Sequence, residues 1–204
     1  MSAMEPFVIR GERVELSVPT HDDVDRIAEV CSDAAVQEWT TVPSPYTRDD
    51  AVGFVENVVG PGWARGTEHT WALRERGRLV GMVGLNLDPA VPRVSAEIGY
   101  WLAPQARGRG LMGEAATLVV DWALDPEGLD AERLVWRAEV GNWSSRRVAW
   151  RLGFRVEGQV RGFLTKRGVR VDGWIGTLLA GDARTPAEPW PDGVPTVTPG
   201  VRAG

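Results

Sequence analysis

Residues 97–124 decide the fold and read EIGYWLAPQARGRGLMGEAATLVVDWAL. The first part, taken with the residues from Val94, is rich in β-branched and aromatic side chains and predicts a strand over 94–102. The last part predicts a helix that ends near Leu124, because apolar residues recur at helical spacing at Ala115, Leu118, Val119 and Trp122. Between strand and helix lies a turn with three glycines and two arginines within seven residues.

This glycine-rich turn is typical of a site that binds an anion. The first turn of a helix leaves about four N–H groups without partners, and the helix dipole adds partial positive charge there. Gly108, Gly110 and Gly113 lack the Cβ atoms that would keep a phosphate at a distance. Arg107 and Arg109 add formal positive charge. The turn therefore predicts a pyrophosphate site at a helix N-terminus.

Two common nucleotide motifs fit the turn poorly. A P-loop needs the string GxxxxGK followed by Ser or Thr, and the sequence does not contain it. The string GxGxxG is present at Gly108–Gly113, but a dinucleotide fold places it after the first strand and ends the next strand on an acidic residue. Here the next predicted strand is followed by Gly141 and Asn142, which argues against that interpretation.

A third pattern fits both the turn and its position. Gln105–Gly110 resembles the pattern Gln/Arg-x-x-Gly-x-Gly/Ala of the GNAT superfamily of N-acetyltransferases, in which the turn follows a strand, opens a helix and holds the pyrophosphate of acetyl-CoA. Downstream, NWSSRRVAWRLGF at Asn142–Phe154 is similar to a signature of the branch that contains the ribosomal-protein N-terminal (alanine or serine) acetyltransferases. The likeness runs from about Val8 to Ala180.

The resemblance implies a cleft for acetyl-CoA between two splayed parallel strands, 94–102 and 133–140. A backbone N–H near Tyr100–Leu102 would polarise the thioester carbonyl. Asn142 would bond to the pantetheine, and Ser145 would lie near the sulfur. The implied cofactor-binding residues are Leu102, Ala103, Gln105, Arg107, Gly108, Arg109, Gly110, Leu111, Met112, Gly113, Asn142 and Ser145. Arg146, Arg147 and Arg151 would either reach the adenosine 3′-phosphate or form a solvated helix face.

The reaction implied is direct attack by a primary amine on the thioester, and it requires two proton transfers. A primary amine is mostly protonated at neutral pH and must lose a proton before it attacks. Glu97 is the predicted base, with a substrate-orienting role and a solvent-facing role as the alternatives. The family often has a tyrosine where this sequence has Trp150, and an indole N–H cannot supply a proton. Ser145 is therefore the predicted acid, unless its hydroxyl only caps the helix.

The acceptor is open from the sequence: either a protein N-terminus or a small-molecule amine. The ribosomal-protein branch can place a glutamate where this chain has Leu164, which weakens any transfer of that branch's substrate. Trp39 is a candidate for the acceptor pocket and Trp63 lies in the same region, whereas Trp71, Trp122 and Trp136 are expected in the core. The missing tyrosine leaves a second possibility, a noncatalytic acyl-CoA-binding or interaction domain. The family also often forms dimers, so a homodimer is possible.

The element order predicts an α+β fold: a mixed, mostly antiparallel central sheet flanked by helices, with one parallel pair from a right-handed crossover. Helices are expected after Thr20 and Thr47, and a chain break at Pro61–Gly66. The predicted strands are 13–20, 70–75, 79–87, 94–102, 133–140, 154–160 and 171–180. We predict one domain over residues 1–180 and an irregular or mobile Pro/Gly-rich tail over 181–204.

Composition excludes several other classes of protein. The net charge of −5 disfavours nonspecific nucleic-acid binding, which needs a basic surface. A single cysteine, Cys31, excludes an intrachain disulfide, and two distant histidines offer little for a metal site or a catalytic triad. The N-terminus has no signal-peptide core, and no apolar run approaches the roughly 20 residues of a membrane span. We therefore expect a cytoplasmic protein with no metal and no membrane partner.

Overall fold

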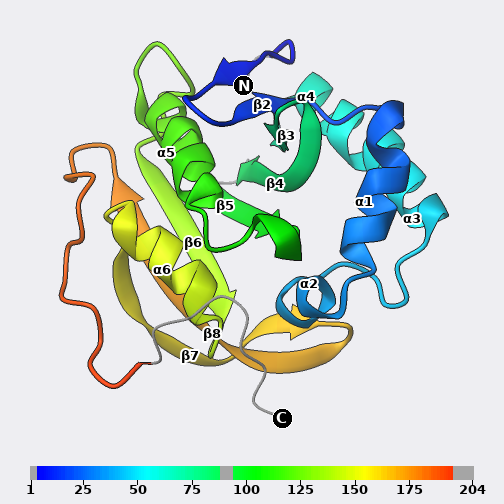
Figure 1. The fold of residues 1–204 in the computed structure, drawn as a ribbon. Helices are drawn as coiled ribbons and strands as arrows, with labels where there is room; N and C mark the ends of the chain where they lie inside the picture. The colour runs from blue at the N-terminus through cyan, green and yellow to red at the C-terminus, as the bar shows by residue number, and fades with distance from the viewer. Residues whose placement is uncertain (1–3, 88–93, 195–204) are drawn as a thin grey trace.

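In the computed structural model of the chain, residues 4–87 and 94–194 are described (Figure 1). The predicted short loop at 88–93 and the last ten residues of the predicted tail lie outside them. The described strands form one sheet in the order β1-β2-β3-β4-β5-β6-β8-β7, and among its pairings only β5 with β6 is parallel. The prediction of a mixed, mostly antiparallel α+β fold is confirmed. The strands are β1 (Ile9–Arg10), β2 (Glu15–Ser17), β3 (Glu68–Glu75), β4 (Arg78–Leu87), β5 (Ser95–Leu102), β6 (Arg133–Glu139), β7 (Arg155–Lys166) and β8 (Val169–Leu179).

Helices cover both faces of the sheet. On one face, α5 (Leu111–Leu124) packs over the largest core cluster, and α6 (Trp143–Arg151) lies beside it (Figure 1). On the other, α1 (Val24–Cys31) and α3 (Arg48–Gly53) pack over a second cluster that contains Ala72, Leu79 and Met82 of the sheet. The remaining helical segments are η1 (His21–Asp23), α2 (Ala34–Trp39), η2 (Phe54–Val59), α4 (Gly60–Arg65) and η3 (Pro104–Ala106). Among the residues described, no helix is long and apolar enough to span a membrane.

The prediction of a chain break at Pro61–Gly66 is wrong. The helix that begins after Thr47 continues through a π-helical segment, η2, into α4 and ends at Gly66. Pro61 is the second residue of α4 and lies directly after the π-helical segment, the irregular turn at which the helix takes in a residue without an N–H to donate. Gly66 has the left-handed conformation (φ 64°) that commonly ends a helix. The sequence reading also missed the short helix α2 and the two-residue strand β1.

The parallel pair separates part-way along its length. Its four paired positions end at Ile98 on β5 and Trp136 on β6. Beyond them β5 continues to pair with β4, as far as Leu102, and β6 continues to pair with β8, as far as Glu139. The two strands therefore each keep only their outer partner, which leaves a gap between their C-terminal halves. This gap is the splayed cleft that the sequence predicts.

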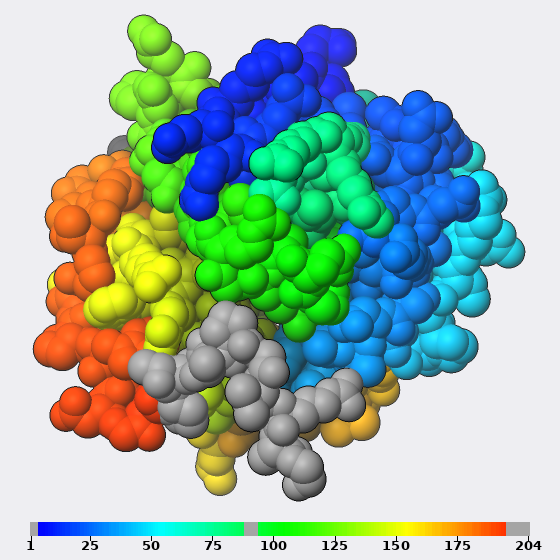
Figure 2. Space-filling view, in the orientation of Figure 1, coloured from blue at the N-terminus to red at the C-terminus, as the bar shows by residue number. Residues whose placement is uncertain are grey.

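The first part of the C-terminal tail is irregular but packed. Residues 181–194 contain no helix or strand, and they run along the outer side of α6 (Figures 1 and 2). The ring of Trp190 lies 5.3 Å from that of Trp150 and 6.2 Å from that of Trp143, centre to centre. The indole N–H of Trp150 donates to the carbonyl of Glu188 at 2.7 Å. Edge-to-face aromatic contacts and this hydrogen bond thus hold the segment against the domain.

Candidate active site

The glycine-rich turn has the backbone that an anion site needs. Gly108 (φ 73°) and Gly110 (φ 78°) both adopt left-handed conformations that disfavour other residues. Gly110 is the N-cap of α5, so the free N–H groups of the first helical turn begin directly after it. Leu111 and Met112 bury their side chains in the core, so only their backbone can face a ligand. A Cβ at Gly113 would meet no heavy atom within 4 Å, which leaves the helix start open.

Charged side chains surround the turn. The Arg109 guanidinium pairs with Glu75, at 2.9 Å between Nη1 and Oε2, and Arg107 donates from Nε to the carbonyl of Leu102 at 3.1 Å. Gln105 is exposed in η3. The sequence reading missed Arg13, whose Nη1 donates to the carbonyl of Arg109 at 2.9 Å.

Arg13 braces the turn from a distant part of the chain. Its Nε donates to Glu114 at 2.8 Å, and its Nη2 lies 3.5 Å from where a Cβ of Gly110 would be. Glu114 also accepts the backbone N–H of Arg13 at 2.7 Å. These contacts link β2 and its approach to the start of α5, and no local pattern in the sequence indicates them.

Backbone donors of β5 face the gap between the splayed strands. The N–H of Ala103 donates to the carbonyl of Val80 on β4 at 2.8 Å. Because backbone groups alternate sides along a strand, the N–H groups of Tyr100 and Leu102 point the other way, into the gap. Ala103 itself is fully buried and its N–H and carbonyl both bond within the protein, so it supports the turn and offers a ligand no free backbone group.

Strand β6 lines the opposite side of the gap in the same manner. The N–H of Val140 donates to the carbonyl of Asp172 on β8 at 3.0 Å. By the same alternation, the N–H and carbonyl groups of Arg137 and the N–H of Glu139 point towards β5, whereas the Glu139 carbonyl accepts the N–H of Asn142 at 3.0 Å. An extended ligand placed in the gap would therefore meet backbone groups on both sides, as a strand does in a sheet.

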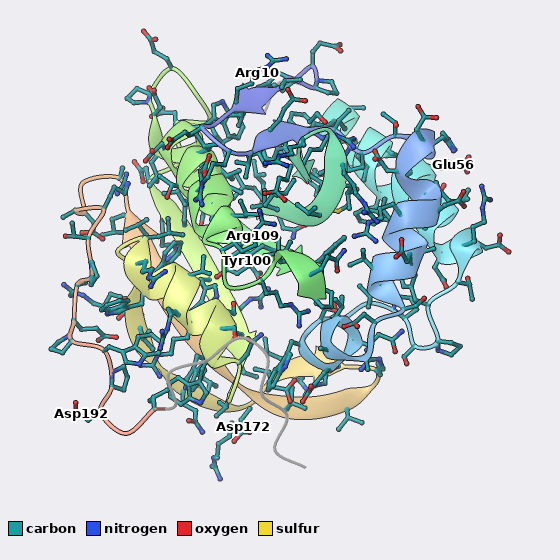
Figure 3. All side chains as sticks on the ribbon, viewed as in Figure 1. Arg10, Glu56, Tyr100, Arg109, Asp172 and Asp192 are labelled. Carbon is teal, nitrogen blue, oxygen red and sulfur yellow. The ribbon has the colours of Figure 1, made fainter. Side chains whose placement is uncertain are left out.

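A hydroxyl pair lies at the α6 side of the gap. Ser145 Oγ accepts the indole N–H of Trp136 at 2.9 Å and lies 3.3 Å from the hydroxyl of Tyr100. The Tyr100 hydroxyl donates to the Ser145 carbonyl at 2.9 Å. Burial raises the pKa of Tyr100, so its hydroxyl stays protonated. Figure 3 shows Tyr100 near the middle of the molecule, between β5 and α6. The sequence reading did not select it.

Asn142, not Ser145, caps helix α6. The Asn142 side-chain oxygen accepts the backbone N–H of Ser145 at 3.1 Å, which leaves its amide N–H₂ for other partners. The capping alternative considered for the Ser145 hydroxyl is therefore wrong. Trp150, at the family's usual tyrosine position, points its indole N–H to the tail.

Glu97 lies on the sheet face opposite to α5. Its neighbours Ala96 and Ile98 are buried in the core under α5, so alternation places Glu97, Gly99 and Trp101 on the other face. Trp101 packs there against residues of α1 and α2. Among the described residues, no heavy atom lies within 4 Å of where a Cβ at Gly99 would be, so this part of the chain leaves a space over the strand between the two larger side chains.

The Glu97 carboxylate forms an ion pair with the guanidinium of Arg137 on β6. The hydrogen bond to Glu97 raises the pKa of Arg137, against the opposite effect of partial burial. The guanidinium carbon lies 5.7 Å from the centre of the Phe163 ring. Glu97 therefore has a charged partner and is 28% exposed. The base, the orienting carboxylate and the solvent-facing residue stay the three predicted roles.

The tip of the β7–β8 hairpin closes this face against α2. Lys166 pairs with Glu139 and also donates to the carbonyl of Glu38 at 3.0 Å. Arg167 donates to the carbonyl of Gln37 at 2.6 Å. In Figure 1 the hairpin and α2 lie next to each other below the splayed strands. The open space over the sheet is therefore bounded by α2 and the hairpin tip.

Only one of the two tryptophans considered for the acceptor region lies near the gap. Trp39 is 37% exposed, and its ring atoms lie 3.5 Å from the Cβ position of Gly141, directly after β6. Trp63 is buried and its indole N–H donates to the carbonyl of Thr70, so it belongs to the core. Trp71 and Trp136 are buried as predicted, and Trp122 packs partly buried against the same core.

Two of the three arginines of α6 pack against aromatic rings, and the third is exposed. Arg146 lies over the rings of Trp143 and Trp174, at 5.2 and 4.8 Å, and is 14% exposed. Arg147 stacks over Trp190 at 4.8 Å. Neither forms the solvated face that was one alternative, whereas Arg151 is exposed.

Residues 13–155 match the family described as the acetyltransferase (GNAT) domain. This region contains the glycine-rich turn, the splayed strands and helix α6, whereas the tip of the β7–β8 hairpin lies outside it. The chain belongs to the GNAT acetyltransferase family. The GNAT protein is thus an acyltransferase that uses acetyl-CoA as acetyl donor and an amine as acceptor.

Relatives with printed names extend the comparison. A protein of Bacillus subtilis (strain 168) named "Putative ribosomal N-acetyltransferase YdaF" is 39% identical over 171 residues, which cover 79% of this chain and 88% of that protein. A structure of RimL, described as a ribosomal L7/L12 α-N-protein acetyltransferase in complex with coenzyme A, superposes with a TM-score of 0.76 at 21% identity, covering 85% and 98% of the two chains. A further structure, the microcin C7 self-immunity acetyltransferase MccE with acetyl-CoA and AMP, gives a TM-score of 0.74 at 21% identity and covers 83% and 93%. These two structures show that the fold is shared.

The residues present fit acetyl-CoA. The two left-handed glycines and the open start of α5 suit a pyrophosphate. The gap with backbone groups on both sides suits the amide-bearing pantetheine arm. The Ser145–Tyr100 pair lies at the α6 side of that gap. Among the residues described, no group of three or more His, Cys, Asp or Glu side chains is placed to hold a metal.

Proposed function

We propose that this GNAT enzyme acetylates the α-amino group of a polypeptide N-terminus. The observation that carries the proposal is the division of β5 between two faces. Tyr100 forms the hydroxyl pair with Ser145 on the α6 side, whereas Glu97 and the open space over Gly99 lie on the other side. An acceptor amine can therefore approach the thioester of acetyl-CoA from the face opposite to the hydroxyl pair. The name of the Bacillus subtilis relative supports a protein acceptor.

When bound, acetyl-CoA supplies the thioester carbonyl that the amine attacks. The backbone N–H of Tyr100 or Leu102 would stabilise the negative charge that develops on the carbonyl oxygen. A preorganised donor of this kind contributes about 3 kcal/mol to the barrier in other acyl-transfer enzymes. Ser145, bonded to the hydroxyl of Tyr100, would hold the proton that the departing thiolate takes up.

Glu97 would accept the proton that the amine loses, directly or through a water molecule. The incoming group is ammonium at neutral pH, and a carboxylate binds ammonium before it removes the proton. The open space over Gly99 lies two residues along the same strand and face, so an amine there would be within reach of both Glu97 and the gap. The negative carboxylate thus both attracts the acceptor and activates it.

The test is acetylation by purified enzyme of a peptide panel and a panel of small amines, followed by thiol release and mass spectrometry. We expect acetylation of peptide α-amino groups, and a kcat about 100-fold lower in Glu97→Gln. Glu56→Gln is the matched control, because Glu56 is a carboxylate of η2 far from β5 (Figure 3). Acetylation of small amines but no peptide would overturn the polypeptide acceptor. Saturable acetyl-CoA binding without thiol release on either panel would favour the noncatalytic alternative. A cytoplasmic location and a homodimer stay predictions.

A further inference from the structure

The ion pair between Glu97 and Arg137 stands at the point where the parallel strands separate. Glu97 is one residue before the last paired residue of β5, and Arg137 is one residue after the last paired residue of β6. Both lie on the acceptor face, because Trp136 and Ala138, the neighbours of Arg137, are buried in the core under α5. The pair therefore spans the mouth of the gap beside the open space over Gly99.

Each member of the pair keeps capacity for a further partner. Arg137 bonds to Glu97 through Nη2 and Oε2, and among the described residues its Nε and Nη1 have no hydrogen-bond partner. The second carboxylate oxygen of Glu97 likewise has no hydrogen-bond partner within the described part of the chain. The side chains are 40% and 28% exposed, so a ligand can reach both. Phe163 packs near the guanidinium and limits its movement.

This arrangement is complementary to a particular chemical group. An N-terminal residue of a polypeptide carries an ammonium and, one carbon away, a peptide carbonyl. The ammonium is a donor and the carbonyl an acceptor, whereas Glu97 offers an acceptor and Arg137 offers donors in a fixed, planar array. A simple alkylamine would satisfy only the carboxylate and leave the free guanidinium donors without a partner.

We propose that Arg137 selects acceptors whose carbonyl is one carbon away from the amino group. Arg137 would donate a hydrogen bond to the first peptide carbonyl while Glu97 binds the amino group. The proposal rests on the proposed function and adds to it the residue that separates peptide N-termini from other amines. A hydrogen bond to a charged group is worth about 10- to 100-fold in affinity or rate. Arg137 is thus a specificity-determining residue of the acceptor site.

The experiment uses two acceptors that differ only at the first peptide bond. The first is a short peptide amide with a free N-terminus. The second is its analogue in which a trans carbon–carbon double bond replaces the first peptide bond, so that the shape is kept while the carbonyl and the amide N–H are both lost. The lost N–H is the same for every variant, so only the carbonyl contribution should depend on residue 137. The ratio of kcat/KM for the two acceptors is measured in wild type, Arg137→Gln, Arg137→Lys and the control Arg133→Gln. Arg133 is an exposed arginine earlier on the same strand.

We expect wild type and Arg133→Gln to prefer the peptide by about 10- to 100-fold. The preference should fall to within about threefold in Arg137→Gln and be intermediate in Arg137→Lys, because lysine donates without the planar array. The two acceptors differ in amine basicity, but this difference is the same for every variant. It therefore cancels when the kcat/KM ratio of one variant is divided by that of another.

Two results would overturn the proposal: the wild-type preference retained in Arg137→Gln, or no preference in wild type. If Arg137→Gln does not fold, wild type and Arg137→Lys still decide: no preference in wild type refutes the proposal, and so does a wild-type preference that is retained in full in Arg137→Lys. Peptide acetylation without discrimination would defeat this inference alone. Failure to acetylate either acceptor would instead defeat the proposed function.

Discussion

A single side chain added at Gly99 tests where the acceptor binds. Gly99 is exposed in the middle of β5, has no positive φ, and pairs through its backbone with Gly84 on β4. A Cβ there would meet no heavy atom within 4 Å. The substitution Gly99→Val therefore adds three carbon atoms on this face of the strand, and the first of them, Cβ, touches no part of the described protein.

The structure gives opposite expectations for stability and activity. Glycine in a strand interior is destabilising by roughly 0.5–1 kcal/mol relative to alanine, so Gly99→Val should leave the free energy of unfolding unchanged or raise it. If the amine occupies this space, valine displaces it by more than 1 Å, and such a misplacement costs about 100-fold in rate. Acetyl-CoA, held on the other side of the strand, should keep its Kd within about twofold.

The assay combines three measurements on Gly99→Val and on the control Gly158→Val. Gly158 is a strand glycine of β7 whose Cβ would likewise meet nothing within 4 Å. Urea unfolding gives the stability, calorimetry gives the Kd of acetyl-CoA, and steady-state kinetics give kcat/KM for the acceptor. Unchanged kcat/KM in Gly99→Val would refute the assignment of the open space to the acceptor. A loss of acetyl-CoA affinity as large as the loss of activity would assign that space to the cofactor.

Three further outcomes are expected. Ser145→Ala removes the acceptor of the Trp136 indole N–H, so urea unfolding should show a free energy of unfolding lower by about 1–3 kcal/mol. The kcat should fall about 10- to 100-fold if the hydroxyl pair with Tyr100 supplies the proton. Gly110→Ala forces a residue with a Cβ into the left-handed conformation, which costs about 1–2 kcal/mol of conformational energy. Calorimetry should show an increased Kd for acetyl-CoA, while kcat at saturation changes little. Burial lowers the pKa of His69 to about 4, so the unfolded chain takes up a proton below about pH 6.5 that the folded chain refuses. Stability should therefore fall by about 2–3 kcal/mol between pH 7 and about pH 4.5 at this residue alone, and urea midpoints of His69→Leu should lack that part of the slope.

The parts of the site that the sequence predicted depend on neighbours along the chain. The turn at Gln105–Gly113 combines glycine conformations, a helix start and adjacent arginines, all of which lie within nine residues. The strands at β5 and β6 follow from local composition, and their parallel pairing follows from the helix between them. The same locality explains the error at Pro61, because a proline ordinarily ends or kinks a helix, and the π-helical turn that precedes it cannot be read from the neighbouring residues.

The parts that the sequence did not predict depend on contacts between distant segments. Arg13 reaches the turn from about one hundred residues away, and Arg137 meets Glu97 across two strands forty residues apart. Neither residue stands out in a motif. Their positions follow only from the register of the sheet, and one sequence cannot fix the residue of β6 that lies opposite a given residue of β5.

The departure at Trp150 shows how the register of β5 organises the chemistry. The tryptophan contacts the tail, so that position offers no hydroxyl, and the phenol beside Ser145 comes from Tyr100 instead. Because side chains alternate along a strand, Tyr100 faces the donor side while Glu97 and Gly99 face the acceptor side. A slip of one residue in the pairing of β5 with β4 would exchange these faces and place the carboxylate under α5. The antiparallel ladder from Gly81–Leu102 to Leu87–Ala96 prevents that slip, and it therefore does more than support the sheet: it keeps the Glu97 carboxylate and the Tyr100 hydroxyl on opposite faces of β5.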